Sequence, residues 1–169
     1  MIYTLGHGTR TIKQFINILL DNGIKYVVDV RSYPKSRTNP QFNEIRLRNA
    51  LAKYKIKYKH IQELGGFRHL KISYPTTLTH KSFSSYAEYM LSDEFKKGLD
   101  ELKAIAEKYK TAYICSETLY WKCHRRMISD ALEYQKWQVY HLGITNEPIR
   151  HTVWNLSRKN RKGQIIYDK

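Results

Sequence analysis

The stretch that decides the fold is residues 2–30, which read IYTLGHGTRTIKQFINILLDNGIKYVVDV. Its first apolar residues end at Gly6, which is typical of a strand that leaves into a tight turn. Thr11 then precedes apolar residues at helical spacing, and Gly23 stops that helix. The near-continuous apolar run at 24–30 predicts a buried parallel strand. A strand, a helix and a strand within about 30 residues predict a βαβ unit.

The rest of the chain continues this alternation. The apolar patterns predict helices at about 43–53, 85–91, 93–109 and 120–135, and strands at 53–60, 111–115 and 137–142. In 53–60 every second residue is lysine, which indicates a strand with one solvated face. Those lysines would either protect an edge strand or track phosphates. Residues 65–84 form a long irregular segment.

We therefore predict an α/β fold in a single domain, with a mostly parallel central sheet and helices on both faces. The expected organisation is an α/β core domain at 1–149 followed by a basic C-terminal extension at 150–169. That extension carries several Lys and Arg residues with Asp168 as their only acidic counterpart.

The charge balance predicts a polyanionic partner. The chain has 30 Lys and Arg against 15 Asp and Glu, a formal net charge of +15. Such an excess in a small domain is typical of nucleic-acid binding, to DNA or RNA, although a lysine-rich proteome or a high-salt cytoplasm would give the same balance. The 14 tyrosines offer flat faces for stacking on bases, or they are simply strand residues.

No apolar run is long enough to span a membrane, and the first residues have no signal-peptide pattern, so we expect a cytoplasmic protein with no membrane partner. The two cysteines, Cys115 and Cys123, are too few for a disulfide scaffold and are expected as free thiols. The chain contains neither a Gly-x-Gly-x-x-Gly nor a Walker A sequence, so no cofactor is expected.

Ligands of open α/β sheets bind at the carboxyl ends of the parallel strands, and this chain places ionisable residues there. Polar side chains follow the first strand, the second strand and the strand at 111–115. The candidate acids and bases are Asp29, Glu117, His7 and His124. The candidates for substrate binding are a phosphate clamp of Arg10, Arg31, Arg37 and Arg125, together with Thr9, Tyr33 and Trp121.

Several of these residues also have a structural interpretation. Asp29 could merely pair with Arg31, because a buried carboxylate beside an arginine is often structural. Glu117 could cap the following helix. The glycines on either side of His7 could serve only the turn.

The cysteines are possible thiol groups rather than metal ligands. Cys115 and Cys123 are eight residues apart, whereas structural zinc sites usually pair cysteines at closer spacing, so no metal is expected. Cys123 lies in a predicted first helical turn beside His124, where a thiolate would be favoured. The alternative is that both are small buried core residues.

The same motifs resemble a known family. They are Thr4-Leu5-Gly6-His7-Gly8, Asp29 to Pro34 with Ser36-Arg37, Leu64-Gly65-Gly66, Cys115-Ser116-Glu117, and Trp121 with Cys123-His124-Arg125. In this order they are similar to the prokaryotic domain of unknown function family 488. The family pattern has Ser at the position of Gly8 and Ala at that of Ser116, both small replacements. The resemblance implies an α/β fold and one polar site built from these motifs, and it implies no activity.

The leading hypothesis is a nucleic-acid-binding enzyme that hydrolyses a glycosidic or a phosphodiester bond. Two carboxylates would suit the first reaction, whereas the second usually needs a metal held by carboxylates. One alternative is a DNA- or RNA-binding protein without catalysis. Another is a thiol-dependent enzyme on a small anion, because Asp29-Val30-Arg31 after a strand is similar to rhodanese-like domains.

Overall fold

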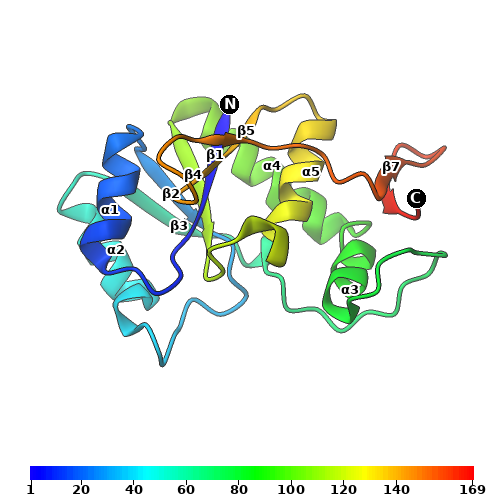
Figure 1. The fold of residues 1–169 in the computed structure, drawn as a ribbon, viewed down its shortest axis with the longest axis horizontal. Coiled ribbons are helices and arrows are strands. Elements are labelled where there is room, and N and C mark those ends of the chain that lie inside the picture. The colour runs from blue at the N-terminus through cyan, green and yellow to red at the C-terminus, as the bar shows by residue number, and fades with distance from the viewer.

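A six-stranded sheet forms the centre of the computed structural model, which describes all residues 1–169 (Figure 1). Its strands are β1 (Ile2–Gly6), β2 (Tyr26–Asp29), β3 (Lys57–His60), β4 (Thr111–Cys115), β5 (Val139–Leu142) and β6 (Ile149–Arg150). They lie in the order β3-β2-β4-β1-β5-β6. β1 to β5 are parallel to their neighbours, and β6 pairs antiparallel with β5.

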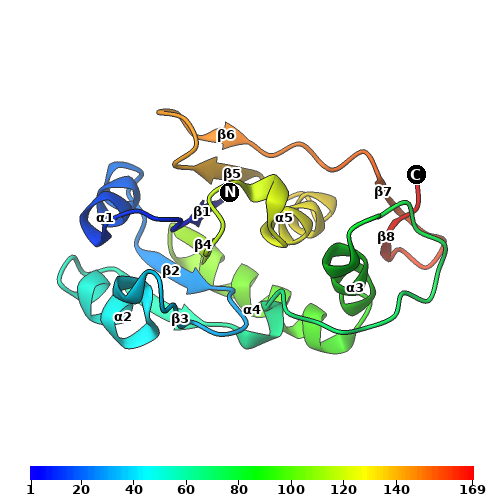
Figure 2. The same cartoon turned by 60° about the horizontal axis from the view of Figure 1, so that its bottom comes forward.

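Helices cover both faces of this sheet, so the predicted α/β fold is confirmed (Figure 2). The helices are α1 (Ile12–Asp21), α2 (Glu44–Ala52), α3 (Lys81–Tyr89), α4 (Asp93–Lys108) and α5 (Arg125–Tyr134), with 3-10 turns η1 (Pro40–Phe42), η2 (Gln62–Leu64) and η3 (Tyr120–Lys122). α1 begins with the capping box at Thr11 and Gln14, in which each side chain bonds the other residue's backbone N–H.

The two faces bury two separate apolar layers. On one face, Phe15 and Leu19 of α1 and Leu51 of α2 pack against strand residues such as Val27. On the other face, α3, α4 and α5 pack against residues that include Tyr113. Neighbouring strand residues alternate between the layers because successive side chains of a strand point to opposite faces.

Three predicted elements differ from the structure. The helix predicted at 85–91 is α3, which begins earlier, at Lys81, inside the segment predicted to be irregular. The expected strand at 53–60 is reduced to β3, because Lys55 has a φ of 58° and turns the chain before Lys57. β3 is the edge strand that the lysine pattern allowed. Lys59 forms an ion pair with Glu101 and Lys57 donates to the hydroxyl of Tyr109 at 2.8 Å, so these lysines contact α4 and its end.

The predicted helix at 120–135 is interrupted. η3 ends at Lys122, Cys123 is extended with φ −129° and ψ 146°, and α5 begins at Arg125 after His124 as N-cap. The sequence pattern placed Cys123 in the first turn of this helix. In the structure Cys123 precedes α5 instead. This interruption turns the backbone at the residues that line the site described below.

Residues 150–169 fold back onto the domain. They contain the end of β6 and a hairpin of β7 (Ser157–Lys159) and β8 (Ile165–Tyr167). Tyr167 is fully buried, and its hydroxyl donates to Asp130 of α5 at 3.0 Å. None of the helices combines the length and the apolar character needed to cross a membrane.

Candidate functional site

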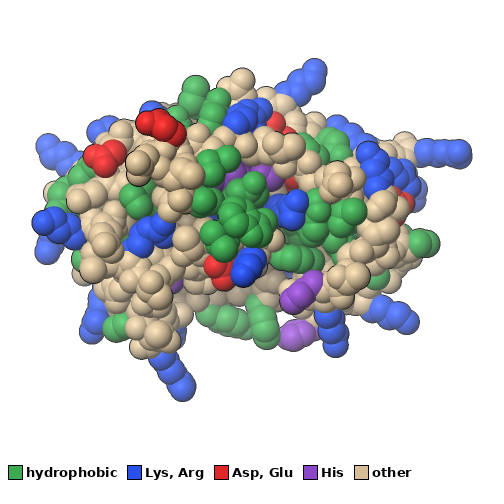
Figure 3. All heavy atoms as spheres, in the orientation of Figure 1, with side chains coloured by type: hydrophobic (Ala, Val, Ile, Leu, Met, Phe, Trp, Pro, Cys, Tyr) green, Lys and Arg blue, Asp and Glu red, His purple; other side chains and the backbone are tan.

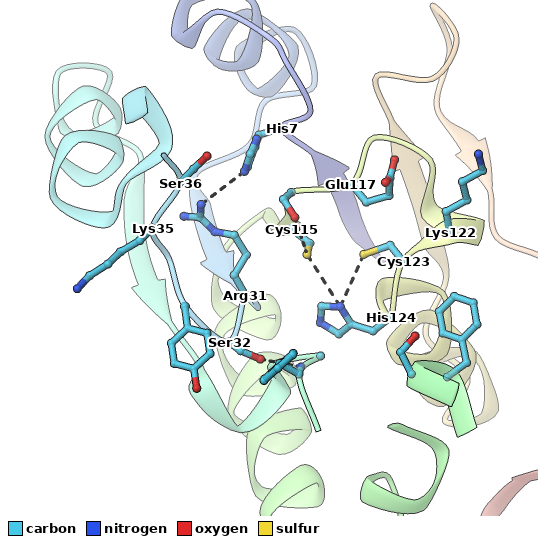
Figure 4. A pocket seen from close by; sticks show the side chains of 16 residues that line it. His7, Arg31, Ser32, Lys35, Ser36, Cys115, Glu117, Lys122, Cys123 and His124 are labelled. Atoms are coloured by element: carbon cyan, nitrogen blue, oxygen red, sulfur yellow. Dashed lines mark hydrogen bonds between the residues drawn. The ribbon is translucent and has the colours of Figure 1, made fainter. Parts of the chain in front are cut away.

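The site lies where the chain leaves two adjacent parallel strands in opposite directions. β1 leads to α1 on one face of the sheet, and its neighbour β4 leads to α5 on the other face. Loops that diverge in this way leave a crevice at the carboxyl ends of the strands. A pocket of about 560 Å³ opens there, and it is lined by residues that follow β1, β2 and β4 (Figure 4).

Glycines allow the loops to approach one another at this crevice. A Cβ atom on Gly6 would lie 1.9 Å from the carbonyl oxygen of Glu117, and one on Gly66 would lie 2.5 Å from Nδ1 of His124. Both distances are far inside van der Waals contact. The motif around Gly6 and the Gly65-Gly66 pair therefore serve the packing of the site's walls.

The two cysteines and His124 form a cluster on the pocket wall. Nδ1 of His124 lies 3.7 Å from Sγ of Cys123 and 3.9 Å from Sγ of Cys115 (Figure 4). Nε2 of His124 lies 3.0 Å from the carbonyl oxygen of Val30. Because a carbonyl can only accept, Nε2 carries the proton, and Nδ1 presents its lone pair to the two sulfur atoms.

The two thiols differ in acidity. Burial raises the pKa of the Cys123 thiol, but hydrogen bonding from Cys115 and the nearby Arg125 guanidinium outweigh it, so that pKa is lowered overall. Contact with Cys123, together with burial, raises the pKa of Cys115. A thiolate in this cluster is therefore centred on Cys123.

His7 is buried on the opposite side of the pocket. Its Nδ1 lies 2.9 Å from the carbonyl oxygen of Gly8, and its ring stacks on Phe42 with centroids 4.3 Å apart. Burial is the main cause that lowers the pKa of His7, and the Arg31 charge adds to it. His7 is thus neutral near pH 7, with Nε2 as the acceptor, 3.5 Å from Nη1 of Arg31.

The four predicted arginines do not form a phosphate clamp. Arg31 donates to the Asp29 carboxylate, with Nη2 to Oδ2 at 2.6 Å. Arg125 is buried and donates to Thr4 Oγ1 at 2.8 Å and to backbone carbonyls. Arg10 bonds the carbonyls of Gly6 and Gly143, while Arg37 is exposed outside the pocket wall. The donors of Arg10, Arg31 and Arg125 are directed to the protein itself, which a sequence pattern does not reveal.

The two predicted carboxylates are in different environments. Asp29 is fully buried, and it also accepts from the hydroxyl of Tyr58 at 2.7 Å, so the structural interpretation of its pairing with Arg31 holds. Glu117 is exposed and lines the pocket, where its Oε1 accepts from the backbone N–H of Leu119 at 3.3 Å. Only Glu117 presents a carboxylate to a ligand in the pocket.

The remaining predicted residues are divided between the pocket and its surroundings. Tyr33 lines the pocket, and Thr9 lies in an adjoining hollow that shares His7 and Glu117 with it. Trp121 is partly exposed but does not line the pocket. Cys115, Cys123, His124, His7 and Arg31 are brought together at the pocket as the strand-end argument expected.

Sequence reasoning missed several pocket residues. They are Lys35, Phe67, Ser82, Phe83 and Lys122, while Ser32 and Ser36 stood in the family motifs but were not singled out as site residues. Phe67 directly follows Gly65-Gly66, so an aromatic residue after a glycine pair in a long irregular segment was the available signal. A groove of about 790 Å³ continues from the pocket through Phe67 and Ser82, and Lys71 and Lys81 line it. Figure 3 shows Lys and Arg side chains around much of one molecular face, with few acidic ones among them.

Comparison with known proteins agrees with the resemblance of the motifs. The family model described as Domain of unknown function DUF488 matches residues 11–132, a range that includes the Cys115 to Arg125 segment but not His7. Neither curated proteins nor solved structures gave a match. Because the model covers most of the sequence, the chain belongs to the DUF488 family.

Proposed function

We propose that the protein is an enzyme that hydrolyses a bond in nucleic acid, with one nucleotide of a strand held in the pocket. The observation that carries the proposal is the combination of aromatic and cationic side chains at this pocket. Tyr33 is 69% exposed and Phe67 is 61% exposed, and Lys35 and Lys122 line the same wall. Exposed rings stack on bases, and lysines neutralise phosphates.

The groove beyond Phe67 supports a path for the neighbouring nucleotides. Lys71 and Lys81 line it, and both are exposed. A single-stranded segment fits such a groove because its unpaired bases are free to stack on aromatic side chains. The formal net charge of +15 favours association with the same class of ligand.

The chemistry assigned to the pocket is activation of water by Glu117. A carboxylate at the pocket surface accepts the proton of an attacking water, and the neutral His7 offers a second acceptor at Nε2. Asp29 is held by Arg31 and Tyr58, so the pocket has no second carboxylate of the kind that glycosidic hydrolysis pairs with the first. A phosphodiester is therefore the favoured bond.

The test is multiple-turnover cleavage of labelled single-stranded and duplex DNA and RNA. Glu117→Gln should lower the rate by about 10²- to 10⁴-fold while binding stays unchanged, because the variant loses a base and keeps the shape. Glu107→Gln is the matched control, since Glu107 is an exposed carboxylate on α4 outside the pocket. Binding without turnover would instead support the non-catalytic alternative.

A second function has one specific observation in its favour. The Cys123 thiol, whose pKa is lowered, lies 3.7 Å from Nδ1 of His124, which suits a thiol-dependent enzyme acting on a small anion. That function requires rapid alkylation of Cys123 at neutral pH in the protein as purified. A slow thiol excludes it.

A further inference from the structure

Two segments of the pocket wall supply three metal-ligand side chains to one point. Cys115 is the last residue of β4, while Cys123 and His124 occupy the turn between η3 and α5. The two sulfur atoms and the imidazole nitrogen all lie within 4.8 Å of one another. The wide spacing of the cysteines in the sequence is bridged here by the fold, so it does not exclude a shared ion.

The distances fit the edges of a zinc tetrahedron. Zn–S bonds of about 2.3 Å and Zn–N bonds of about 2.0 Å place a sulfur and a nitrogen roughly 3.5 Å apart. The two distances from Nδ1 of His124 to the sulfur atoms are 3.7 and 3.9 Å. The two nitrogen–sulfur edges therefore need shifts of only a few tenths of an ångström to take an ion.

The neighbours of His124 fix the imidazole tautomer that a metal ligand needs. Its Nε2 is bonded to the carbonyl of Val30 at 3.0 Å, which leaves Nδ1 deprotonated and directed at the cysteines. Metal-bound histidines usually donate their other nitrogen to such a group. Tyr86 packs edge-on against the ring at 5.1 Å, and Gly66 lies close beside it, so its orientation is fixed.

We propose that Cys115, Cys123 and His124 bind one Zn²⁺ ion per chain, with the fourth coordination position open to the pocket. Two thiolates and an imidazole select zinc over magnesium, calcium or manganese, which prefer oxygen ligands. Three protein ligands and an open position are the arrangement of catalytic zinc rather than structural zinc. All three residues line the pocket, so a water molecule or a substrate oxygen reaches the fourth position from there.

The metal site stands on this geometry alone, and only the role of the bound water rests on the proposed function. Zinc lowers the pKa of a bound water to about 7, which supplies a nucleophile for phosphodiester hydrolysis. Glu117, the base of the proposed function, lines the same pocket and would accept the proton from that water.

The test begins with the reduced, full-length protein and zinc alone. Purified protein without a histidine tag is supplied with Zn²⁺, dialysed and analysed for metal, and a second sample is loaded with Co²⁺. The expected results are one ion per chain, thiolate-to-cobalt charge-transfer absorption, and an X-ray absorption spectrum with two sulfur ligands at about 2.3 Å. Failure to retain zinc, or zinc bound without sulfur ligands, would overturn the site.

Variants then assign the ligands. Cys115→Ser, Cys123→Ser and His124→Asn should each weaken zinc binding at least about a hundredfold, whereas Ser82→Ala and His69→Ala should leave it unchanged. Ser82 lines the same pocket and bonds His80 rather than the cluster, and His69 is an exposed histidine in the adjoining groove. Circular dichroism checks that each variant is folded. If a variant fails to fold, the cobalt spectrum of the wild type still tests the site. Equal zinc affinity in all five variants would contradict the assignment.

The outcomes separate this inference from the proposed function. If the protein binds one zinc ion per chain but does not cleave nucleic acid, the metal site stands and the proposed function is wrong. If cleavage continues after zinc has been removed completely, the metal site has no role in the reaction and is not occupied in the active enzyme. Rapid alkylation of both thiols that a chelator does not accelerate overturns the zinc site in favour of thiol chemistry.

Discussion

Two histidine-containing clusters are attached to α5, and they differ in how their polar atoms are used. In the pocket cluster, His124 faces Cys115 and Cys123 at sulfur distances of 3.9 and 3.7 Å, beside an open cavity. In the second cluster, which we call the buried chain, Asp130 bonds His151 at 2.8 Å and His151 bonds His141 at 2.9 Å. No polar group of the buried chain reaches the pocket wall.

The buried chain holds the end of the protein in place. The Asp130 carboxylate also accepts from the backbone N–H of Trp154 at 2.9 Å and from the hydroxyl of Tyr167 at 3.0 Å. One carboxylate thereby joins α5 to β6 and to the β7–β8 hairpin. The comparison teaches that residues of catalytic type are structural where their atoms bond one another, and available for chemistry where they face a cavity.

The largest expected effect is a loss of stability on mutation of the buried chain. If that loss is not observed, the distinction between the two clusters is wrong. Asp130→Ala leaves three donors without an acceptor, two of them buried and one partly buried, so it should lower the free energy of unfolding by about 3–5 kcal/mol. Glu117→Ala, in the pocket, should change it by no more than about 0.5 kcal/mol because Glu117 is exposed. Urea unfolding measures both. An equal loss in the two variants would contradict the distinction between the clusters.

Tyr167→Phe removes a single bond of the same buried chain. Its hydroxyl donates to a carboxylate, so the loss should be about 1.5–3 kcal/mol. Tyr33→Phe is the matched control, because Tyr33 is 69% exposed. Thermal unfolding of the two variants ranks them, and a lower midpoint for Tyr33→Phe would reverse the prediction.

The buried chain should also make stability depend on pH. Burial, followed by the charges of His151 and Arg125, lowers the pKa of His141 to about 2 in the folded protein. The unfolded chain binds a proton at this residue below about pH 6.5, whereas the folded one does not. The stability that depends on neutral His141 is therefore fully present above pH 6.5. Below that pH the free energy of unfolding falls by up to about 1.4 kcal/mol per pH unit.

His141→Phe tests this dependence, because the variant keeps a ring to stack on Tyr120, which lies 3.5 Å away between centroids. Its unfolding free energy should fall less steeply between pH 6.5 and pH 5 than that of the wild type. His69→Ala, an exposed histidine, should keep the steep dependence. Parallel slopes in wild type and His141→Phe would show that another group causes the acid sensitivity.

Much of the fold could be predicted because its signals are local. The apolar runs of β1 and β4, and the capping box at Thr11, are readable without knowledge of their neighbours. The strand-end rule likewise predicted that His7 and Cys115 meet at one rim. The resemblance of the motifs identified the family.

The rest depended on contacts that sequence patterns do not encode. A continuous helical pattern concealed the break at Cys123, and that break directs its sulfur toward Cys115 and His124. The direction of Arg125 depends on carbonyl groups of a loop that the fold brings beside it. Asp130 and His151 are 21 residues apart, and only the return of the C-terminal segment pairs them.

The smallest expected effect concerns the pocket, where lysine side chains should contact the phosphates of a bound strand. Lys35→Ala with Lys122→Ala removes two cations from the pocket wall. If both neutralise phosphates of a single strand, the slope of log affinity against log salt should become shallower by about 1.4. Lys97→Ala with Lys108→Ala removes the same charge from exposed positions on α4, outside the pocket. Titration of a labelled oligonucleotide over a salt series measures both slopes, and an equal change in the two double variants would assign binding to net charge rather than to the pocket.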